Sequence, residues 1–494
     1  MTDAAGEGAS KKYILLPLCA GIVIYAVVLA EGNRLLLDPD IYWQIAVGQW
    51  IVDHRTVPWT DIYSFTMQGK PWMSSQWLAL VFYGQAYAWF GWTGPAVVAS
   101  LATALAYMIV ARFLVRRLGV LWVLPILALS FLIARPHLYA RPHVLVLPVM
   151  VAWVCALLSA VERRKAPSFL VAALMALWVN LHGSFIFGLL LIAPIAVDAA
   201  LAADSSERWR LLRRWFLFGI VATAACCVTP YGWNAFRAAH AILDLGKALK
   251  LIREWAPLDF GVLGPIQVGI FLILAFIFFR GMKLPLMRNV LFAGLLYMAM
   301  AHFRNADVFA LLAPLVVATP LAIQFGVHAD KLIWTSPLRR NVVLSGAAMV
   351  FAGITIFACV AGRYHPGRWF APEAAVEALK ANHAKRIFND YNFGGYMISK
   401  GLAPYIDGRA ELYGEKFALE YNAALQLLKP GVFLDLLARH GIDTTLLSRN
   451  APAARMLDHL DGWQKIFIDD RVVVHVRDAD AVHSADPEIK PASN

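Results

Sequence analysis

The chain has 494 residues, of which 60% are hydrophobic and only 16% are charged, and its mean hydropathy is +0.59. This composition is too apolar for a soluble domain of ordinary make-up. The net charge of +11 does not indicate nucleic-acid binding, because the Lys and Arg residues fall in short clusters between apolar stretches. The sequence therefore predicts a polytopic α-helical membrane protein with no nucleic acid among its partners.

Apolar stretches of membrane-crossing length recur along the first three quarters of the chain. The first, Tyr13 to Ala30, is followed by no small-residue cleavage pattern, so we expect a retained span rather than a signal peptide. The stretch from Ser75 to Phe90 is apolar but carries glutamines and aromatics, and we expect it to lie in the membrane plane. This choice brings every later basic cluster to the cytoplasmic side. The further spans are then 95–114, 120–134, 143–161, 168–181, 184–203, 215–229, 266–281, 289–302, 306–325 and 341–361, which makes about eleven transmembrane helices.

The composition changes to that of a soluble domain from Arg363 onward. There a helical pattern at Pro372–Ala381 alternates with strand-like runs at Arg386–Asn389, Thr444–Leu447 and Arg471–Val476. We predict a transmembrane domain over 1–361 with a large outer loop at 31–94, a C-terminal extracytoplasmic α/β domain over 362–480, and a flexible tail over 481–494. The N-terminus is expected in the cytoplasm and the C-terminal domain outside it.

Most of the unusual polar residues fall at the outer ends of the expected spans. Ionisable groups at membrane depth are costly and are kept mainly for ligands, pathways or pairing, so their collection at one face predicts a polar cavity there. The set comprises Asp38, Asp40 and Asp61 in the first loop, Arg135, His137, Arg141 and His143 in "RPHLYARPH", Asn180 and His182 in "WVNLHGSF", Arg253 and Glu254 in "LIREW", and Arg304 and Asp307 in "HFRNAD".

Structural explanations compete with functional ones for these residues. Asp38 or Asp40 is also in the right place to cap the helix that follows, and Pro39 suits a helix start. Asp61 in "PWTDIYSF" is also typical of an Asx-type turn. His182 is alternatively a structural histidine of the core whose ring nitrogens are hydrogen-bonded. The arginines can snorkel to the membrane surface, and Arg304 has the alternative of pairing with Glu254.

The outer domain contains a second polar segment, "NDYNFGGYMISKGLAPYIDGRAELYGEK". Two strand ends carrying its polar groups side by side would form a polar rim, with Asp407 and Arg409 as candidate ligand-binding residues. Turn formation is the alternative, since Asn, Asp and Gly dominate turns. Arg409 also has the alternative of pairing with Asp407 or Glu411.

Outward-facing carboxylates near several Arg and His side chains suit the transfer of a sugar from a lipid phosphate. A carboxylate can take the proton of an acceptor hydroxyl, while Arg and His bind the leaving phosphate. The chain has no Gly-rich phosphate loop, no HExxH, no GxSxG and no CxxC motif, so the sequence gives no support for nucleotide, metalloprotease, serine-hydrolase or thiol-redox chemistry.

The layout resembles the GT-C superfamily of membrane glycosyltransferases, and within it the protein-mannosyltransferase and aminoarabinose-transferase branch. The matching features are a first span, an acidic motif "LDPDIYW" in a large outer loop, an interfacial helix pair and a span that ends in "VARFLVRRLG", over roughly residues 13 to 205. A group of bacterial membrane proteins with similar "DPD", "RPH", "NDYNFGGYMI" and "YIDGRAELYG" segments resembles most of the chain.

This resemblance implies a polyprenyl-phosphate-linked sugar as donor and Asp40 as catalytic base. Asp38 and Asp61 would be supporting carboxylates, or metal ligands together with Asp40, since some superfamily members use a divalent cation and others use none. Pro39 separates the two acids, whereas relatives have them adjacent, which leaves the identity of the base open. The expected donor-phosphate and substrate-binding residues are Arg135, His137, Arg141, His143, His182, Arg253, Glu254, Arg304, Asp407 and Arg409.

The function expected from the sequence is that of a bacterial inner-membrane glycosyltransferase that acts on a periplasmic lipid, glycan or protein. One alternative is a transporter or flippase of a lipid-linked saccharide. This alternative predicts charged residues spread along a path through the membrane and a chain built from two repeated halves. Another is a non-catalytic assembly subunit of envelope polysaccharide biosynthesis. Charges that cluster at one face, without a repeat, favour the enzyme.

Overall fold

The computed structural model describes residues 15–251, 253–327, 337–362 and 364–478, and the predicted tail lies outside them. The chain forms two compact units. The helical unit comprises the described residues of Met1–Leu37, Ser75–His240 and Lys250–His365, and the mixed unit comprises those of Asp38–Ser74, Ala241–Leu249 and Pro366–Asn494. Much of the predicted outer loop therefore belongs to the same compact unit as the C-terminal domain.

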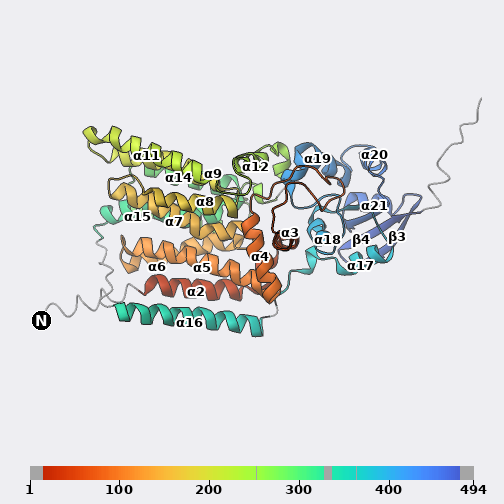
Figure 1. Ribbon diagram of the computed structural model, residues 1–494, viewed down its shortest axis with the longest axis horizontal. Helices are drawn as coiled ribbons and strands as arrows, with labels where there is room; N and C mark the ends of the chain where they lie inside the picture. Colours follow the sequence, from red (N-terminus) through yellow and green to blue (C-terminus); the bar gives the residue numbers. More distant parts are fainter. Residues whose placement is uncertain (1–14, 252, 328–336, 363, 479–494) are drawn as a thin grey trace, which may run out of the picture. The chain divides into compact units, whose positions relative to one another are not determined.

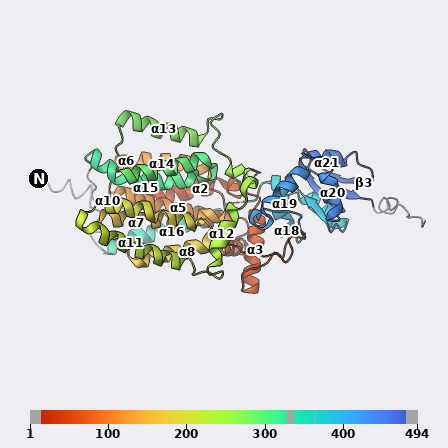
Figure 2. The same ribbon diagram turned by 90° about the horizontal axis from the view of Figure 1, so that it is seen from above.

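The helical unit is built from apolar helices that lie side by side in Figures 1 and 2. They are α2 (Leu16–Ala30), α5 (Thr93–Val115), α6 (Val120–Ala134), α7 (Pro142–Glu162), α8 (Ala173–Leu181), α9 (Phe185–Leu190), α10 (Ile192–Leu201), α11 (Ser205–Ala225), α13 (Pro265–Arg280), α14 (Leu286–Ala301), α15 (Ala306–Gln324) and α16 (Pro337–Ala361). Figure 2 shows α13 at the margin of this group, where it packs against α6.

Five helical segments in the described residues are long and apolar enough to cross a membrane: Thr93–Val115, Val120–His137, Pro142–Glu162, Phe303–Gln324 and Leu338–Ala361. Several shorter apolar helices accompany them, among them Leu16–Ala30 and Pro265–Arg280. A helix suits a membrane because all its backbone groups are satisfied within the segment. The polytopic helical architecture is confirmed, while the count of about eleven spans stays a prediction.

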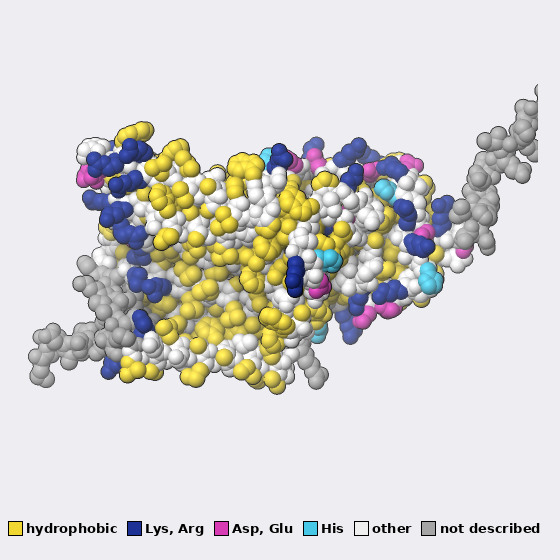
Figure 3. Space-filling model, in the orientation of Figure 1, with side chains coloured by type: hydrophobic (Ala, Val, Ile, Leu, Met, Phe, Trp, Pro, Cys, Tyr) yellow, Lys and Arg dark blue, Asp and Glu magenta, His cyan; other side chains and the backbone are white. Residues whose placement is uncertain are grey.

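Basic residues gather at one end of the helical unit. Arg116 and Arg117 follow α5, Arg163 and Arg164 follow α7, and further arginines open α11. Figure 3 shows this end as a dark blue band beside a mostly yellow, apolar surface. We call it the basic end, and the opposite end of the same helices the outer end. The segregation has the pattern that positive residues adopt on the cytoplasmic side of membrane proteins.

The stretch expected in the membrane plane forms α4 (Trp77–Phe90), which packs on α5 and α8. Figure 1 shows α4 running steeply to the direction that α2 and α5 share. Gly91, at a φ of 56°, ends the helix, and α5 starts two residues later. An in-plane position stays a prediction, which this orientation favours.

The mixed unit contains a four-stranded sheet of order β1-β2-β4-β3. Its strands are β1 (Ile387–Asn389), β2 (Thr444–Ser448), β3 (Trp463–Ile468) and β4 (Val472–Arg477). β1 and β2 are parallel and the other neighbours antiparallel, with Thr445 opposite His475. The three predicted strands are confirmed to within a residue or two, and β3 was missed.

Helices α3 (Ile41–His54), α17 (Glu373–Ala381), α18 (Gly394–Ser399), α19 (Ala410–Leu425), α20 (Val432–Arg439) and α21 (Pro452–Leu457) complete the mixed unit. Its core includes Phe388, Tyr405 and Phe433, and Phe65 of the first loop packs against this core. The Thr66 hydroxyl donates to the Tyr405 carbonyl oxygen at 2.7 Å. The first loop is thereby a structural part of this unit.

Candidate functional site

The turn between α6 and α7 places the two Arg-Pro-His sequences at the outer end of the helical unit. The Ala140 N–H donates to the Leu35 carbonyl oxygen at 2.7 Å, which ties the turn to the end of α2. His143 Nε2 donates to the His137 carbonyl oxygen at 3.2 Å and lies 3.7 Å from Asp307 Oδ2. The His137 ring contacts Phe303 with centroids 4.0 Å apart. Three of the predicted polar residues, His137, His143 and Asp307, thus come together from neighbouring helix ends.

The segment around Glu254 is docked onto the end of α14 by backbone hydrogen bonds. The Leu258 N–H donates to Met300 O at 2.9 Å, and the Phe303 N–H donates to Ala256 O at 3.0 Å. The Arg304 guanidinium lies over the Trp255 ring, 4.7 Å from its centroid. These contacts bring "REW" and "HFR", which are about 50 residues apart, to one place.

Arg141 forms an ion pair with Glu254 in this region. Burial alone would raise the pKa of Glu254, but the nearby guanidinium groups of Arg141 and Arg304 lower it on balance. The pairing expected from the sequence, Arg304 with Glu254, is therefore only part of the arrangement, since Arg141 holds the direct contact. Glu254 stays ionised and is shared by two arginines.

His182 stands within electrostatic range of both Arg141 and Arg304. The Ser184 N–H donates to His182 Nδ1 at 3.1 Å, so Nδ1 is the accepting nitrogen and a neutral ring carries its proton on Nε2. We define the polar cluster as Arg141, Glu254, Arg304, His137, His143, His182 and Asp307. It offers two guanidinium groups and several imidazole N–H groups against few carboxylates, which suits a bound anion.

Two predicted residues stand apart from the polar cluster. Arg135 forms an ion pair with Glu31, which also pairs with Arg34, and the Arg135 side chain is 51% exposed. Burial would raise the pKa of Glu31, but its two arginines lower it on balance. Glu31 closes the end of α2 and was missed from the sequence. The side chain of Arg253 lies outside the described part of the structure.

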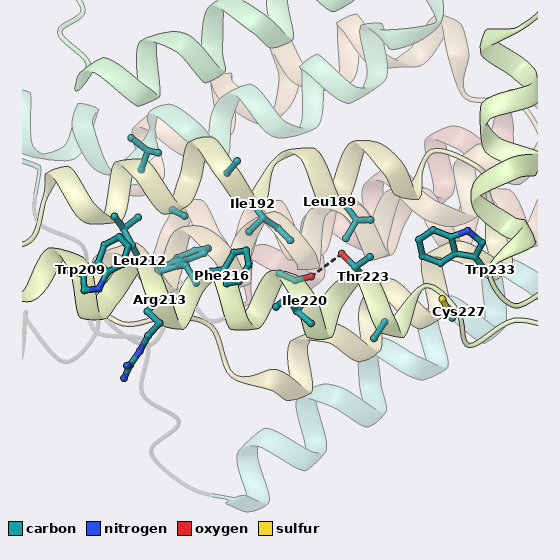
Figure 4. Close-up of a pocket in the computed structure, with 16 residues that line it drawn as sticks. Leu189, Ile192, Trp209, Leu212, Arg213, Phe216, Ile220, Thr223, Cys227 and Trp233 are labelled. Carbon is teal, nitrogen blue, oxygen red and sulfur yellow. Dashed lines mark hydrogen bonds between the residues drawn. The ribbon is translucent and has the colours of Figure 1, made fainter.

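A large apolar groove runs along α10 and α11 of the helical unit, with a cavity volume of about 1160 Å³. Figure 4 shows Trp209 and Arg213 at one end, Trp233 and Cys227 at the other, and Ile192, Phe216 and Ile220 between them. At 1.5 Å per residue, the stretch of α11 that lines it is roughly 23 Å long, most of the thickness of a hydrocarbon core. An extended lipid chain fits such a groove.

The outer end of this groove adjoins the segment that carries His182. Asn180 Nδ2 donates to the Val228 carbonyl oxygen at 2.8 Å, and the ring of Phe236 contacts both Phe185 at 5.2 Å and Trp233 at 4.5 Å. Asn180 also accepts from Trp77 Nε1 at 2.7 Å. The apolar groove thus leads toward the polar cluster within one compact unit.

In the mixed unit, the two acids of "LDPDIYW" have different environments. The Asp38 side chain is buried and its Oδ1 accepts the Asp40 N–H at 2.8 Å, as in an Asx turn. Asp40 is the N-cap residue of α3, but its side chain makes no capping hydrogen bond. The capping explanation therefore does not account for the Asp40 carboxylate, whereas a local structural role accounts for Asp38.

Asp61 lies in a buried ionic network that we call the Arg409 lock. Arg409 Nη1 donates to Asp61 at 2.5 Å, and its Nε and Nη2 donate to Asp407 at 2.8 and 2.6 Å. Asp61 also accepts from Tyr63 N–H and from both Ser64 N–H and Oγ–H, which is the turn geometry considered for it. All three charged side chains are fully buried.

Tyr413 completes the lock by donating to Asp407 Oδ2 at 2.7 Å. The Arg409 guanidinium also lies over the rings of Trp72 and Tyr63, 4.7 and 5.3 Å from their centroids. Burial would raise the pKa of Asp407, but Arg409 holds it below its usual value. A network so fully paired has no group left for a ligand, so the geometry favours structural roles for Asp61, Asp407 and Arg409.

No group of three or more His, Cys, Asp or Glu side chains among the described residues is arranged to hold a metal ion. Asp61, one of the three predicted ligands, has the Arg409 guanidinium against its carboxylate. The use of a divalent cation by this protein stays an untested prediction.

Two functional candidates were missed from the sequence: Trp43 and Gly408. Trp43 follows Asp40 by three residues at the start of a helix, a spacing that puts two residues on one face. Gly408 stands inside the "DGR" that was read as turn chemistry. The spacing was a usable signal for Trp43, but the close approach of Gly408 to α3 was not visible without the fold.

No protein-family model and no curated protein sequence matches the chain. Among solved structures, the chain is similar to ArnT from Cupriavidus metallidurans bound to undecaprenyl phosphate. The identity is 14%, the TM-score is 0.51, and the match covers 95% of this chain and 98% of that one. The chain shares the overall fold of this structure. The resemblance inferred from the motifs is thereby confirmed at the level of the fold.

The archaeal oligosaccharyltransferase AglB from Archaeoglobus fulgidus, in complex with an inhibitory peptide and a dolichol-phosphate, also matches. The identity is 12%, the TM-score is 0.44, and the match covers 89% of this chain and 69% of AglB. The apo form of the Archaeoglobus fulgidus oligosaccharyltransferase matches at a TM-score of 0.43 and 12% identity, over 87% of this chain and 69% of that one.

Proposed function

We propose that the protein is a membrane glycosyltransferase that moves a sugar from a polyprenyl-phosphate donor to a hydroxyl-bearing acceptor. The observation that carries this proposal is the polar cluster at the outer end of a long apolar groove. A polyprenyl phosphate has the same two parts, an extended apolar chain and an anionic head. The GT-C fold and the undecaprenyl phosphate bound to ArnT support the same donor class.

Arg141 and Arg304 are the proposed phosphate-binding residues. Guanidinium groups make strong, directional hydrogen bonds to phosphate oxygens, and they stabilise the charge that the phosphate gains as its bond to the sugar breaks. The Nε2–H of His182 supplies a further donor. Glu254 holds both arginines in place, because its ionised carboxylate pairs with Arg141 and attracts Arg304.

Asp40 remains the proposed base. In this reaction the carboxylate takes the acceptor proton, the acceptor oxygen forms a bond to the anomeric carbon, and polyprenyl phosphate leaves with the electron pair of the broken C–O bond. The displacement inverts the anomeric centre because acceptor and leaving group stand on opposite faces of the sugar. The acceptor is a periplasmic lipid, glycan or protein, and the basic end of the helical unit faces the cytoplasm of a bacterial inner membrane.

The test is mass spectrometry of lipids in membranes of the source organism after incubation with extracted polyprenyl-phosphate sugars. Wild-type protein should release free polyprenyl phosphate, and Asp40→Asn should retain the intact donor, with a rate lowered by about 10² to 10⁴-fold. Asp53→Asn, which changes an exposed carboxylate on the same helix, is the matched control and should act as wild type.

Donor that binds but is moved across the membrane unchanged would replace this proposal with the flippase alternative. Donor that neither binds nor reacts would favour the assembly subunit. Topology is checked separately: a cysteine at Lys70 should react with an impermeant thiol reagent from outside, and one at Lys165 should not.

A further inference from the structure

The carboxylate of Asp40 lies against Gly408 of the "DGR" segment, within the mixed unit. A Cβ atom added at Gly408 would overlap Oδ1 of Asp40, and it would stand 2.7 Å from Cγ of Asp40 and 2.9 Å from Nε1 of Trp43. These are the three atoms nearest to that position. The Asp40 carboxylate therefore occupies the space that a side chain at position 408 would need.

The indole N–H of Trp43 stands at the same place without a partner. Trp43 is 3% exposed, and its Nε1 makes no hydrogen bond among the described residues. A buried N–H left unpaired costs stability, so such a group calls for an explanation. A bound ligand oxygen would supply the missing acceptor.

We propose that Asp40, Trp43 and Gly408 form the acceptor-hydroxyl site of the reaction. Gly408 seats the carboxylate by leaving room for it, and Trp43 donates its indole N–H to an oxygen of the acceptor, next to the base that takes the acceptor proton. The ligand class is an alcohol, either a sugar hydroxyl or a hydroxyl side chain. This inference rests on the proposed function.

The Arg409 lock explains why the site holds its shape. Arg409, the residue after Gly408, is fixed to Asp61 of the first loop and to Asp407. At the same start of α3, the Pro39 carbonyl oxygen stands 2.8 Å from the position of a Cβ at Gly395. Both contacts fix the position of the start of α3 against the C-terminal part of the unit. A preorganised site requires such a fixed position.

The first test uses Gly408→Ala with and without Asp40→Asn, and measures the rate of polyprenyl phosphate release. If Gly408 acts through the Asp40 carboxylate, Gly408→Ala should lower the rate by about 100-fold alone and by nothing further in the Asp40→Asn background. Gly408 has no positive φ, so the added methyl group strains contacts rather than backbone.

Gly394→Ala is the matched control. Its added Cβ would overlap the Ile406 carbonyl oxygen and stand 2.7 Å from Cβ of Asp407, and no atom of Asp40 or Trp43 is among the three atoms nearest to it. It should lower the amount of folded protein equally in both backgrounds. If Gly408→Ala lowers the release rate by the same factor in the Asp40→Asn background as in the wild type, Gly408 does not act through the Asp40 carboxylate. That result would overturn the proposal.

The second test replaces the indole N–H and keeps an aromatic ring. Trp43→Phe should lower the release rate by about tenfold, the value of one hydrogen bond, while Trp50→Phe on the same helix should leave it unchanged. Equal rates for Trp43→Phe and Trp50→Phe would overturn the proposed donor role.

A measurement without turnover separates this proposal from the proposed function. The indole N–H resonance of Trp43, identified by its loss in Trp43→Phe, should shift in Asp40→Asn and in Gly408→Ala and stay in place in Asp53→Asn. An unmoved resonance in Asp40→Asn would overturn the site even if donor is consumed. A shifted resonance in protein that consumes no donor would leave the site standing and remove the glycosyltransferase function.

Discussion

Arginine and carboxylate side chains meet in both units, but with a different balance of charge and exposure. In the Arg409 lock, one guanidinium is divided between two carboxylates, and all three side chains are fully buried. In the polar cluster, two guanidinium groups share Glu254, and the paired side chains of Arg141 and Glu254 are 19% and 31% exposed. A fully buried ionic network holds a fold together, whereas a partly exposed one can be reached by a ligand.

The largest effect that tests this comparison is expected for Arg409→Met. Removal of the guanidinium leaves Asp61 and Asp407 buried without a counter-charge, which should destabilise the mixed unit by about 3–5 kcal/mol. Limited proteolysis and thermal unfolding of the full chain in detergent measure the loss. Arg439→Gln, which removes an exposed pair with Glu420, should give no measurable change. Similar stability of the two variants would mean that the lock is not structural.

The opposite behaviour is expected for Arg304→Gln in the polar cluster. The fold should be retained, and affinity for polyprenyl phosphate should fall by about 10- to 150-fold, the equivalent of one charged hydrogen bond worth 1.5–3 kcal/mol. Binding is measured by titration of the purified protein with the lipid. Arg135→Gln should bind as wild type, because Arg135 is held by Glu31 outside the cluster. Equal losses in both variants would indicate a diffuse attraction of charge rather than a site.

The apolar groove gives a smaller effect of the same kind. Gly219→Phe places a ring inside the groove, where the nearest side chain, Ile192, leaves room at 4.0 Å. If the ring displaces about two methylenes of the lipid chain, affinity falls by about tenfold. Gly294→Phe adds the same ring to α14, where nothing lies within 4 Å, and serves as the control. Unchanged binding in Gly219→Phe would move the lipid chain to another face of the helical unit.

The sequence predicted the parts of the fold that depend on local pattern. Apolar stretches found the helices, and short strand-like runs found β2 and β4, which are buried at most positions. β3 was missed because its residues are largely half-exposed or exposed, so no apolar alternation marks it. Ionisable residues at span ends found most of the polar cluster, because their cost at membrane depth makes them unusual wherever they occur.

Long-range contacts limited the rest. That Asp61 belongs with Arg409, 348 residues away, could not be predicted, and without it the first loop reads as part of the membrane domain. For the same reason the sequence could not show that the three first-loop acids have different environments. The structure separates them: Asp38 holds a turn, Asp61 holds the lock, and the Asp40 side chain does not cap its helix.

The smallest expected effect concerns pH, and its sign follows from the lock. Arg409 holds the pKa of Asp407 below its usual value despite burial, so this stabilisation is present above the ordinary carboxylate pKa and is lost as the pH falls through the lowered one. The unfolding temperature of the full chain should therefore drop on acidification below about pH 4, and Asp407→Asn should show a shallower drop.

Glu411 works in the opposite direction in the same unit. Burial raises its pKa although Trp72 donates to it at 3.1 Å, so its contribution is greatest at low pH and weakens as the pH rises through its raised pKa. Glu411→Gln should therefore flatten the stability profile on the alkaline side of the carboxylate range, where Asp407→Asn leaves it unchanged. If stability falls with pH in the same way in the wild type and in both variants, the acid sensitivity arises outside the lock. The contrast between the buried network and the accessible cluster would then rest on the binding data alone.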